Sequence, residues 1–386
     1  MKQSGLYIHV PYCRSKCIYC DFYSGGASCA DWQQLTKALL KELHIRRREL
    51  KSSVDTIYIG GGTPSLIPCD EFRHLVNGIT LEFGGSIHIS EFTIEVNPED
   101  VTEDKCRVWR DCGVNRVSMG CQSFVDSELL AVKRRHNSKS SIDGYGVLRE
   151  YFDNISIDLM YGLPGQSVES WRESVSVAMD MRPEHLSAYS LMFEEGTALS
   201  VLRDKGRLNF PNEDECLAMW RILSERLRKE GYCQYEISNY ALPGKESVHN
   251  SRYWYGNPYL GLGPSAHSYD GIDIRRSNPN DLKRYLSFYC ADSPTDTAVG
   301  NSVFYEEEHL SKEELAEEML ITRMRLAAGM DTTEYEGRFG ILDKQRLINN
   351  ARPFIDNGDL IYDGVLLKLS HKGIMVSDEI ILALSM

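Results

Sequence analysis

The chain has 386 residues, of which 42% are hydrophobic and 26% charged, a balance typical of a globular protein of two or three domains. Its formal net charge of −13 disfavours broad binding to nucleic acid or to an anionic membrane, because both favour basic surfaces. We therefore expect no nucleic-acid partner, and membrane association only through a partner protein.

Residues 1–10 show no apolar region of a secretory signal, and no apolar run approaches the ~18 residues of a membrane-spanning helix. The sequence therefore predicts a cytoplasmic protein. In that reducing compartment we expect the 11 cysteines to be free thiols and metal ligands rather than disulfides.

Short apolar or β-branched runs alternate with amphipathic stretches over the first half of the chain. Strand and helix in alternation predict right-handed βαβ crossovers and a parallel sheet. An open doubly wound sheet and a full or partial barrel both fit this pattern. In either fold, functional residues are expected at the carboxyl ends of the strands. The predicted strands are 5–10, 56–61, 92–97, 115–121, 155–162 and 185–192, and the helices among them include 30–50 and 99–113.

The pattern loosens from about residue 193. A long helix is predicted at 212–230, an aromatic, glycine-rich segment at 249–269 and a helix at 311–328. Further helices, two strands with a turn and a final helix then predict a small winged-helix-like C-terminal domain. The predicted domains are 1–195, 196–305 and 306–386.

Three cysteines, Cys13, Cys17 and Cys20, follow the first predicted strand with the spacing C-x3-C-x2-C. A short loop can hold three thiolates around a cubane iron–sulfur cluster and leave one iron open to another ligand. A zinc site would need a fourth protein ligand, for which Cys29 and His9 are available. Three buried cysteines without a metal are the remaining alternative.

This triplet resembles the signature of the radical S-adenosylmethionine (SAM) superfamily, and Tyr19 matches the aromatic residue usual there. The resemblance implies a partial (β/α)6 barrel and a [4Fe-4S] cluster held by the three cysteines. It also implies SAM bound through its amino and carboxylate groups to the open iron. An electron from the cluster cleaves SAM to methionine and a 5′-deoxyadenosyl radical in this superfamily, which requires an electron donor.

Polar residues occur at the ends of the predicted strands. The run GGGTPS (60–65) follows the second strand, Glu95 ends the third, Gln122 ends the fourth, and Asp158 lies in the fifth. Carboxylate and amide oxygens can accept hydrogen bonds from the ammonium and ribose hydroxyls of SAM, and Arg134 can pair with a carboxylate. A plain turn, loop caps and a solvated helix face are the alternatives.

Within the superfamily, these motifs resemble the oxygen-independent coproporphyrinogen III oxidase branch in order across about residues 5–165. Members of that branch can hold two SAM molecules. Carried over position by position, the resemblance implies a SAM site formed by Tyr7, Tyr19, Gly61, Gly62, Thr63, Glu95, Gln122, Arg134 and Asp158.

Two departures separate the chain from the oxidases. The oxidases carry a further cysteine two residues after the third ligand, where this sequence has Phe22. They also carry an extension ahead of the first strand, which here begins at about residue 5. Both departures weaken the oxidase interpretation.

The segment His249-Asn250-x-x-Tyr253-Trp254 matches the HNxxYW motif of the HemW haem-chaperone family. The resemblance implies a haem site in which His249 offers an imidazole, Tyr253 a phenolate alternative, and Trp254 a flat apolar surface. His267 is a second candidate ligand. An aromatic core segment with a hydrogen-bonded histidine is the alternative interpretation.

Two functions of different class follow. The first is a haem chaperone that binds a [4Fe-4S] cluster, SAM and haem and transfers haem to an acceptor protein. The second is an oxygen-independent coproporphyrinogen III oxidase, which would use the radical to decarboxylate propionate side chains. A radical enzyme acting on another substrate is a weaker third possibility, and no catalytic residue is assigned.

Overall fold

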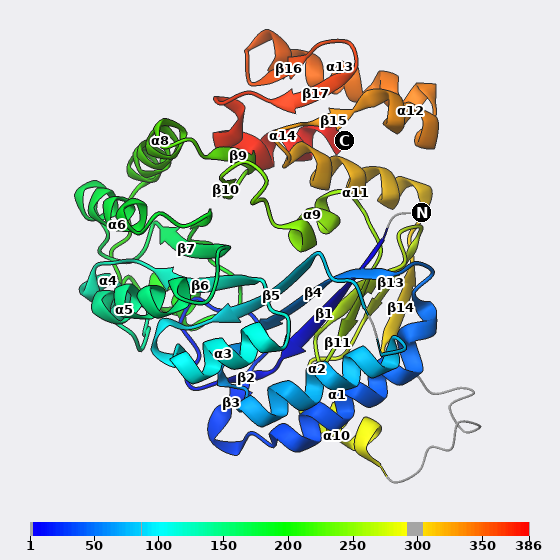
Figure 1. Ribbon diagram of the computed structural model, residues 1–386. Helices are drawn as coiled ribbons and strands as arrows, with labels where there is room; N and C mark the ends of the chain where they lie inside the picture. The colour runs from blue at the N-terminus through cyan, green and yellow to red at the C-terminus, as the bar shows by residue number, and fades with distance from the viewer. Residues whose placement is uncertain (1–2, 86, 292–303, 386) are drawn as a thin grey trace.

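The computed structural model describes residues 3–85, 87–291 and 304–385. Most of these residues form an α/β unit around a curved 12-stranded sheet of order β14-β13-β12-β11-β1-β4-β5-β6-β7-β8-β10-β9 (Figure 1). In the described residues both end strands have one neighbour only, so the barrel is partial, as predicted.

The six predicted strands are confirmed as six consecutive parallel neighbours at the centre of this sheet. We call the edge at which they end the carboxyl edge and the opposite one the amino edge. Their bounds are β1 Ser4–Val10, β4 Val54–Gly61, β5 Glu91–Val96, β6 Arg116–Gln122, β7 Ile155–Tyr161 and β8 His185–Ser190.

Helices cross from each of these strands to the next and cover the outer face. Several of these helices follow a capping residue whose side chain accepts a hydrogen bond from a backbone N–H of the first turn. Examples are Asp31, Thr102 and Asn137. Gly113, predicted to end the third crossover helix, has a φ of +93°, which glycine adopts at little cost. The helices are α1 Trp32–Arg46, α2 Cys69–Glu82, α3 Glu103–Asp111, α4 Asp126–Ala131, α5 Ser138–Arg149 and α6 Val168–Met181.

Side chains alternate between the two faces of the sheet. On β1, for example, Leu6, Ile8 and Val10 are buried in the main hydrophobic core, whereas Tyr7 and His9 hydrogen-bond to each other. The same alternation gives the inner face of the barrel a polar lining. This polar inner face distinguishes the barrel from one filled by apolar side chains.

Residues 196–291 and 304–309 extend the sheet at both ends rather than packing as a separate layer. β9 and β10 continue from β8, and β11 pairs parallel to β1, followed by β12 to β14 in antiparallel order. The elements are α7 Ala198–Asp204, α8 Glu213–Lys229, β9 Cys233–Glu236, β10 Asn239–Ala241, α9 Val248–Trp254, β11 Tyr259–Leu262, β12 His267–Tyr269, β13 Ile274–Ser277, α10 Leu282–Cys290 and β14 Glu306–His309. One hydrophobic core spans Leu6 to Phe304, so the boundary at residue 195 stays a prediction.

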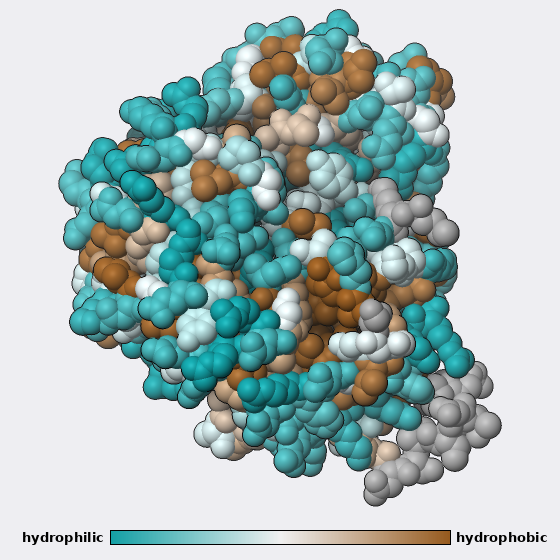
Figure 2. Space-filling view, viewed as in Figure 1, coloured by the Kyte–Doolittle hydropathy of each residue, from teal (hydrophilic) through white to brown (hydrophobic). Residues whose placement is uncertain are grey.

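The C-terminal region has its own hydrophobic core, which includes Met319, Leu347 and Leu384. Its helix–strand–helix–helix–strand–strand order and three-stranded sheet fit a winged-helix-like arrangement. Figure 2 shows hydrophobic groups on this region at the top of the view. The elements are α11 Lys312–Met324, β15 Met330–Asp331, α12 Thr332–Phe339, α13 Ile341–Asp356, β16 Leu360–Tyr362, β17 Leu366–Leu369 and α14 Ser377–Ser385.

Candidate cofactor site

The cysteine loop leaves the carboxyl edge of the sheet between the short strands β2 (Tyr12–Cys13) and β3 (Gly25–Gly26). Cys13, Cys17 and Cys20 are free thiols of intermediate exposure. The amide of Ile18 donates to the carbonyl of Val132 at 3.4 Å, which ties the loop to the segment after α4. The loop thus presents three accessible sulfurs from one anchored segment.

Without a metal, the environment of the thiols favours their protonated form. Burial is the largest cause that raises the pKa of Cys20, to about 11, and it also raises the pKa of Cys13. Nearby Cys17 raises both values further. Among the residues that the structure describes, no three His, Cys, Asp or Glu side chains converge on one metal ion. A cubane cluster needs no such convergence, because each thiolate binds a different iron, so the donor set fits a cluster.

A chain of hydrogen bonds joins two of these cysteines through the carboxyl edge. Cys13 Sγ lies 3.1 Å from Thr63 Oγ1, to which Asn97 Nδ2 donates at 3.4 Å. Arg134 Nη2 donates to Asn97 Oδ1 at 3.0 Å, and Arg134 Nη1 donates to Cys17 Sγ at 3.7 Å. We call these five residues the relay. Sequence reasoning missed Asn97, although its place directly after the third strand was a usable signal.

Arg134 is held tightly at this edge. Its Nη2 also donates to the carbonyl oxygen of Gly120 at 2.5 Å, and its Nε has no hydrogen-bond partner within the described ranges. The guanidinium therefore faces the cysteine loop and keeps one buried donor available. Its predicted pairing with a carboxylate stays a prediction.

Glu95 and Asp158 lie on the polar inner face. Glu95 Oε1 accepts from Tyr58 Oη at 2.7 Å, and its Oε2 accepts from the amide of Gly61 at 3.1 Å. Burial is the main cause that raises the pKa of Glu95 to about 7, and the charge of Asp158 raises it further. Asp158 accepts from Ser118 at 3.2 Å, and burial raises its pKa as well. Burial thus shifts both carboxyl groups toward their neutral form, and a cationic ligand would shift them back toward the charged form.

The glycines at the end of β4 are required by packing around the cysteine loop. A Cβ on Gly62 would lie 2.6 Å from the carbonyl oxygen of Tyr12 and 2.8 Å from that of Val10. Gly61 has a φ of +104°, and a Cβ there would lie 2.7 Å from the ring of His9. Glycine at these positions allows β4 and the cysteine loop to approach each other.

The remaining candidates of the SAM site lie on β1, at the end of β6 and in the cysteine loop itself. Gln122 has a φ of +64° at a register shift between β6 and β7. Tyr19 packs against the small hydrophobic cluster that contains Ile18 and Leu163, and Tyr7 Oη lies 3.1 Å from His9 Nδ1. The structure thus brings the predicted strand-end residues to one edge, and their roles toward SAM stay predictions.

His249 lies at the opposite, amino edge, inside the barrel. Its Nδ1 is 2.9 Å from Thr56 Oγ1 and its Nε2 is 3.0 Å from Tyr253 Oη. The residue is 1% exposed, and burial lowers the pKa of its imidazole to about 3, with the charges of Arg252 and Arg116 as smaller causes. In this structure neither ring nitrogen is free to bind iron.

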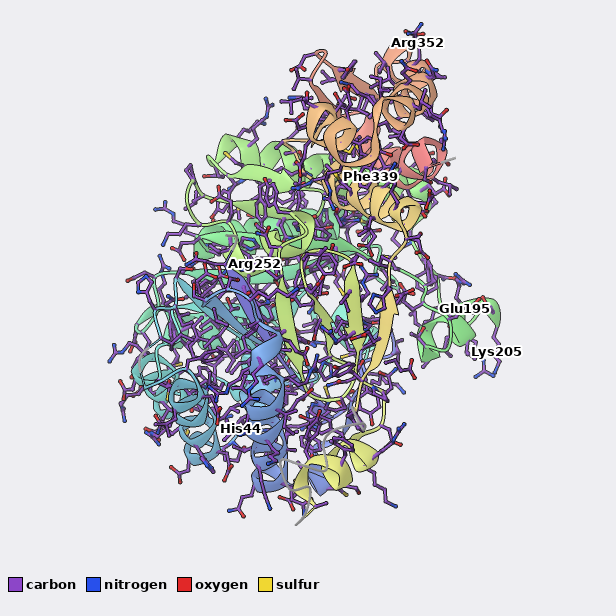
Figure 3. The ribbon with its side chains drawn as sticks, turned by 90° about the vertical axis from the view of Figure 1, so that its right-hand side faces the viewer. His44, Glu195, Lys205, Arg252, Phe339 and Arg352 are labelled. Atoms are coloured by element: carbon purple, nitrogen blue, oxygen red, sulfur yellow. The ribbon has the colours of Figure 1, made fainter. Side chains whose placement is uncertain are left out.

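Buried polar contacts fix α9 at this edge. Arg252 forms an ion pair with Asp55 and donates from Nε to Thr56 Oγ1 at 3.0 Å. The guanidinium of Arg325, just after α11, lies 5.1 Å from the ring of Trp254. Figure 3 shows Arg252 between the sheet and the C-terminal domain, on which Phe339 is labelled. The HNxxYW segment is therefore a junction between the barrel and that domain.

His267 has a different setting. It begins β12, which runs antiparallel to β11. His267 therefore lies near the end of β11, at the carboxyl edge that the cysteine loop occupies. It is exposed, unlike His249. The two candidate haem ligands thus lie at opposite edges of the barrel.

Comparisons with known proteins match this fold and site. The model of the radical SAM superfamily matches residues 7–178, and that of the HemN C-terminal domain matches residues 310–376. The coproporphyrinogen III oxidase HemN of Escherichia coli has a TM-score of 0.81 at 21% identity, with 100% of this chain and 90% of that chain covered. At that identity the likeness concerns the fold.

Two curated relatives match over nearly their whole lengths. The heme chaperone HemW of Bacillus subtilis (strain 168) is 32% identical over 97% of this chain and 97% of its own. The heme chaperone HemW of Lactococcus lactis subsp. lactis (strain IL1403) is 31% identical over 98% of this chain and 96% of its own. The chain therefore belongs to the HemW heme chaperone family within the radical SAM superfamily.

Proposed function

We propose that the protein is a haem chaperone. It binds a [4Fe-4S] cluster through Cys13, Cys17 and Cys20, SAM at the adjoining carboxyl edge, and haem, which it passes to an acceptor protein. The observation that carries this proposal is the similarity to HemW chaperones over 97% of the chain, together with the family's cysteine loop. A cytoplasmic location and a separate one-electron donor are part of the proposal.

The residues of the carboxyl edge have distinct roles in this proposal. A bound cluster would supply an electron and an open iron to SAM. Glu95 and Asp158, which share the polar inner face, would accept hydrogen bonds from its ammonium and ribose hydroxyl groups. A cationic ammonium would also favour the charged form of Glu95, whose pKa burial raises to about 7 in the ligand-free protein.

The oxidase alternative receives less support. Phe22 occupies the position of the oxidases' additional cysteine, and its side chain is 60% exposed beside the cysteine loop. The similarity to HemN at 21% identity supports a shared fold rather than a shared reaction. No residue of the inner face is assigned as catalytic.

The haem ligand is the least constrained part of the proposal. His249 could bind iron only after the ring nitrogen that binds it gives up its hydrogen bond, to Thr56 for Nδ1 or to Tyr253 for Nε2. Burial raises the pKa of Tyr253 well above its usual value, which disfavours a phenolate ligand. His267 is exposed and needs no such rearrangement.

A haemin titration tests binding and locates the ligand. The full chain is reconstituted anaerobically with iron and sulfide and titrated with haemin, in parallel with His249→Ala and His267→Ala. We expect saturable binding by the wild type and a changed haem spectrum in the variant that lacks the ligand. An unchanged spectrum and affinity in both variants would remove both histidines as ligands, and absence of saturable binding would contradict the chaperone proposal.

A further inference from the structure

We propose that Asn97 is a positioning residue that sets the reduction potential of the cluster. It does so by holding Thr63 and Arg134 against the sulfurs of Cys13 and Cys17. The inference rests on the proposed cluster site and adds to it a residue outside the cysteine loop.

The geometry places Asn97 at the centre of the relay. Its Oδ1 accepts from Arg134 and its Nδ2 donates to Thr63, so one amide uses both of its ends on the two groups that touch the thiols. The amide nitrogen of the Asn97 backbone donates separately to Ser65 Oγ at 3.2 Å, which fixes the position of the residue itself. The side chain is therefore free to serve the relay alone.

Arg134 depends on this contact for its direction. Its guanidinium is bound by Asn97 Oδ1 at 3.0 Å and by the carbonyl of Gly120 at 2.5 Å, and this pair of acceptors aims Nη1 at Cys17 Sγ. A long arginine side chain without one of its two acceptors gains rotational freedom. Loss of the Asn97 side chain should therefore weaken the N–H contact to the sulfur.

Hydrogen bonds and positive charge at a cluster sulfur stabilise the reduced, more negative form of a one-electron couple more than the oxidised form. Weaker contacts at Cys17 and Cys13 should thus lower the reduction potential. A merely structural asparagine would affect the stability of the fold and leave the potential unchanged.

Asn115 provides a matched control. It also joins β5 to β6 through two side-chain hydrogen bonds, accepting from the amide of Phe92 at 2.8 Å and donating to the carbonyl of Ser90 at 3.1 Å. These contacts lie at the amino edge, away from the cysteine loop. Asn115→Ala should therefore lower the melting temperature without changing the potential.

The test is an anaerobic redox titration of full-length, cluster-loaded protein, followed by the electron paramagnetic resonance signal of the reduced cluster. We expect a more negative midpoint potential for Asn97→Ala than for the wild type and for Asn115→Ala. Thr63→Val removes the hydroxyl contacts to Cys13 and to Asn97 but leaves the contacts of Arg134 to Asn97 and Cys17, so it should give a smaller shift in the same direction. A variant with both Asn97→Ala and Thr63→Val should show a shift smaller than the sum of the two single shifts, because the two residues act in one relay.

A cluster-loaded Asn97→Ala protein with the wild-type potential would overturn the inference while leaving the proposed cluster site intact. An equal shift in Asn115→Ala would overturn it as well. If Asn97→Ala does not take up a cluster, the potential of Thr63→Val tests the inference alone. A wild-type potential in Thr63→Val would then contradict the relay. A wild-type chain that binds no iron–sulfur cluster would overturn the proposed function and this inference together.

Discussion

The carboxylate of Glu91 binds the helix that carries His249, with Oε1 of Glu91 2.9 Å from the amide nitrogen of His249. Its Oε2 accepts from the amide of Val248 at 2.8 Å, and Oε1 also accepts from Ser247 Oγ at 3.2 Å. The first residue of β5 thus caps α9. This contact holds the HNxxYW segment inside the amino edge of the barrel, in a site that keeps the imidazole of His249 neutral.

A neutral, buried His249 makes folding sensitive to acid. Its pKa falls from 6.5 to about 3 on folding, so its contribution to stability is complete above pH 6.5 and decreases as the pH falls below that value. We expect the unfolding free energy of the wild type minus that of His249→Gln to fall by about 2 kcal/mol as the pH is lowered from 7.5 to 5. Chemical denaturation across this range measures it.

The exposed His74 on α2 provides the control for this measurement, because its side chain lies largely in solvent. His74→Gln should change the unfolding free energy little at either pH. A difference between wild type and His249→Gln that stays constant with pH would contradict the buried, neutral state of His249.

Glu95 should have the opposite pH dependence. Its pKa is 4.5 in the unfolded chain and about 7 in the fold, so stability decreases as the pH rises from 4.5 through 7. In protein without cluster or SAM, we compare the unfolding free energy of Glu95→Gln with that of the wild type. The value for the variant minus that for the wild type should rise by about 2.5 kcal/mol between pH 5 and pH 8. The exposed Glu225→Gln on α8 serves as the comparison, and equal pH profiles for the two variants would refute the raised pKa.

Arg325 connects the C-terminal domain to the barrel. Its Nη2 lies 3.6 Å from Oε2 of the buried Glu236, and its guanidinium covers the ring of Trp254. We expect Arg325→Ala to lower the unfolding free energy by about 2 kcal/mol, because a buried carboxylate loses its cation. Faster hydrogen exchange in α9 should accompany this loss.

The surface pair of Arg226 on α8 and Glu230, which follows this helix, offers a matched comparison, since each side chain is nearly half exposed. Arg226→Ala should cost about 0.5 kcal/mol or less. If Arg325→Ala lowered the unfolding free energy as little as Arg226→Ala and left hydrogen exchange in α9 unchanged, the junction between the C-terminal domain and α9 would not be a stabilising contact.

The cysteine loop yields a selective prediction. Cys17→Ala should remove the iron–sulfur absorption of reconstituted protein, since two thiolates leave the cluster short of a ligand. Cys69→Ala should keep that absorption, because Cys69 lies at the start of α2, outside the loop. Iron and sulfide analysis of both purified variants measures the outcome, and cluster retention in Cys17→Ala would contradict the ligand set.

The sequence predicted the central six strands because each is a compact β-branched run, and it predicted the cysteine loop because the spacing is local. It did not predict that β11, the four residues Tyr259–Leu262, would pair parallel to β1. Such a short strand has no periodic pattern, and its partner lies about 250 residues away in the chain. Its place in the sheet depends on tertiary packing.

The same distinction applies to the site. Glu95 and Gln122 could be placed at strand ends from the sequence, because parallel strands share one carboxyl edge. The relay through Asn97 could not be predicted from the sequence, since its hydrogen bonds join four separate segments. A buried, hydrogen-bonded His249 is the alternative that the sequence left open beside a haem ligand. The sequence could not decide between the two, because the burial depends on the absence of a side chain at Gly5, where a Cβ would lie 3.0 Å from the ring.

A haem chaperone with this fold should carry haem and should not oxidise coproporphyrinogen III. Cluster-loaded wild-type protein is incubated anaerobically with SAM, a reductant and coproporphyrinogen III, and haemin-loaded protein is mixed in parallel with an apo haem protein. We expect transfer of haem to the apo protein and no protoporphyrinogen. Protoporphyrinogen formed in stoichiometric or greater amount, or the absence of haem transfer, would contradict the chaperone proposal.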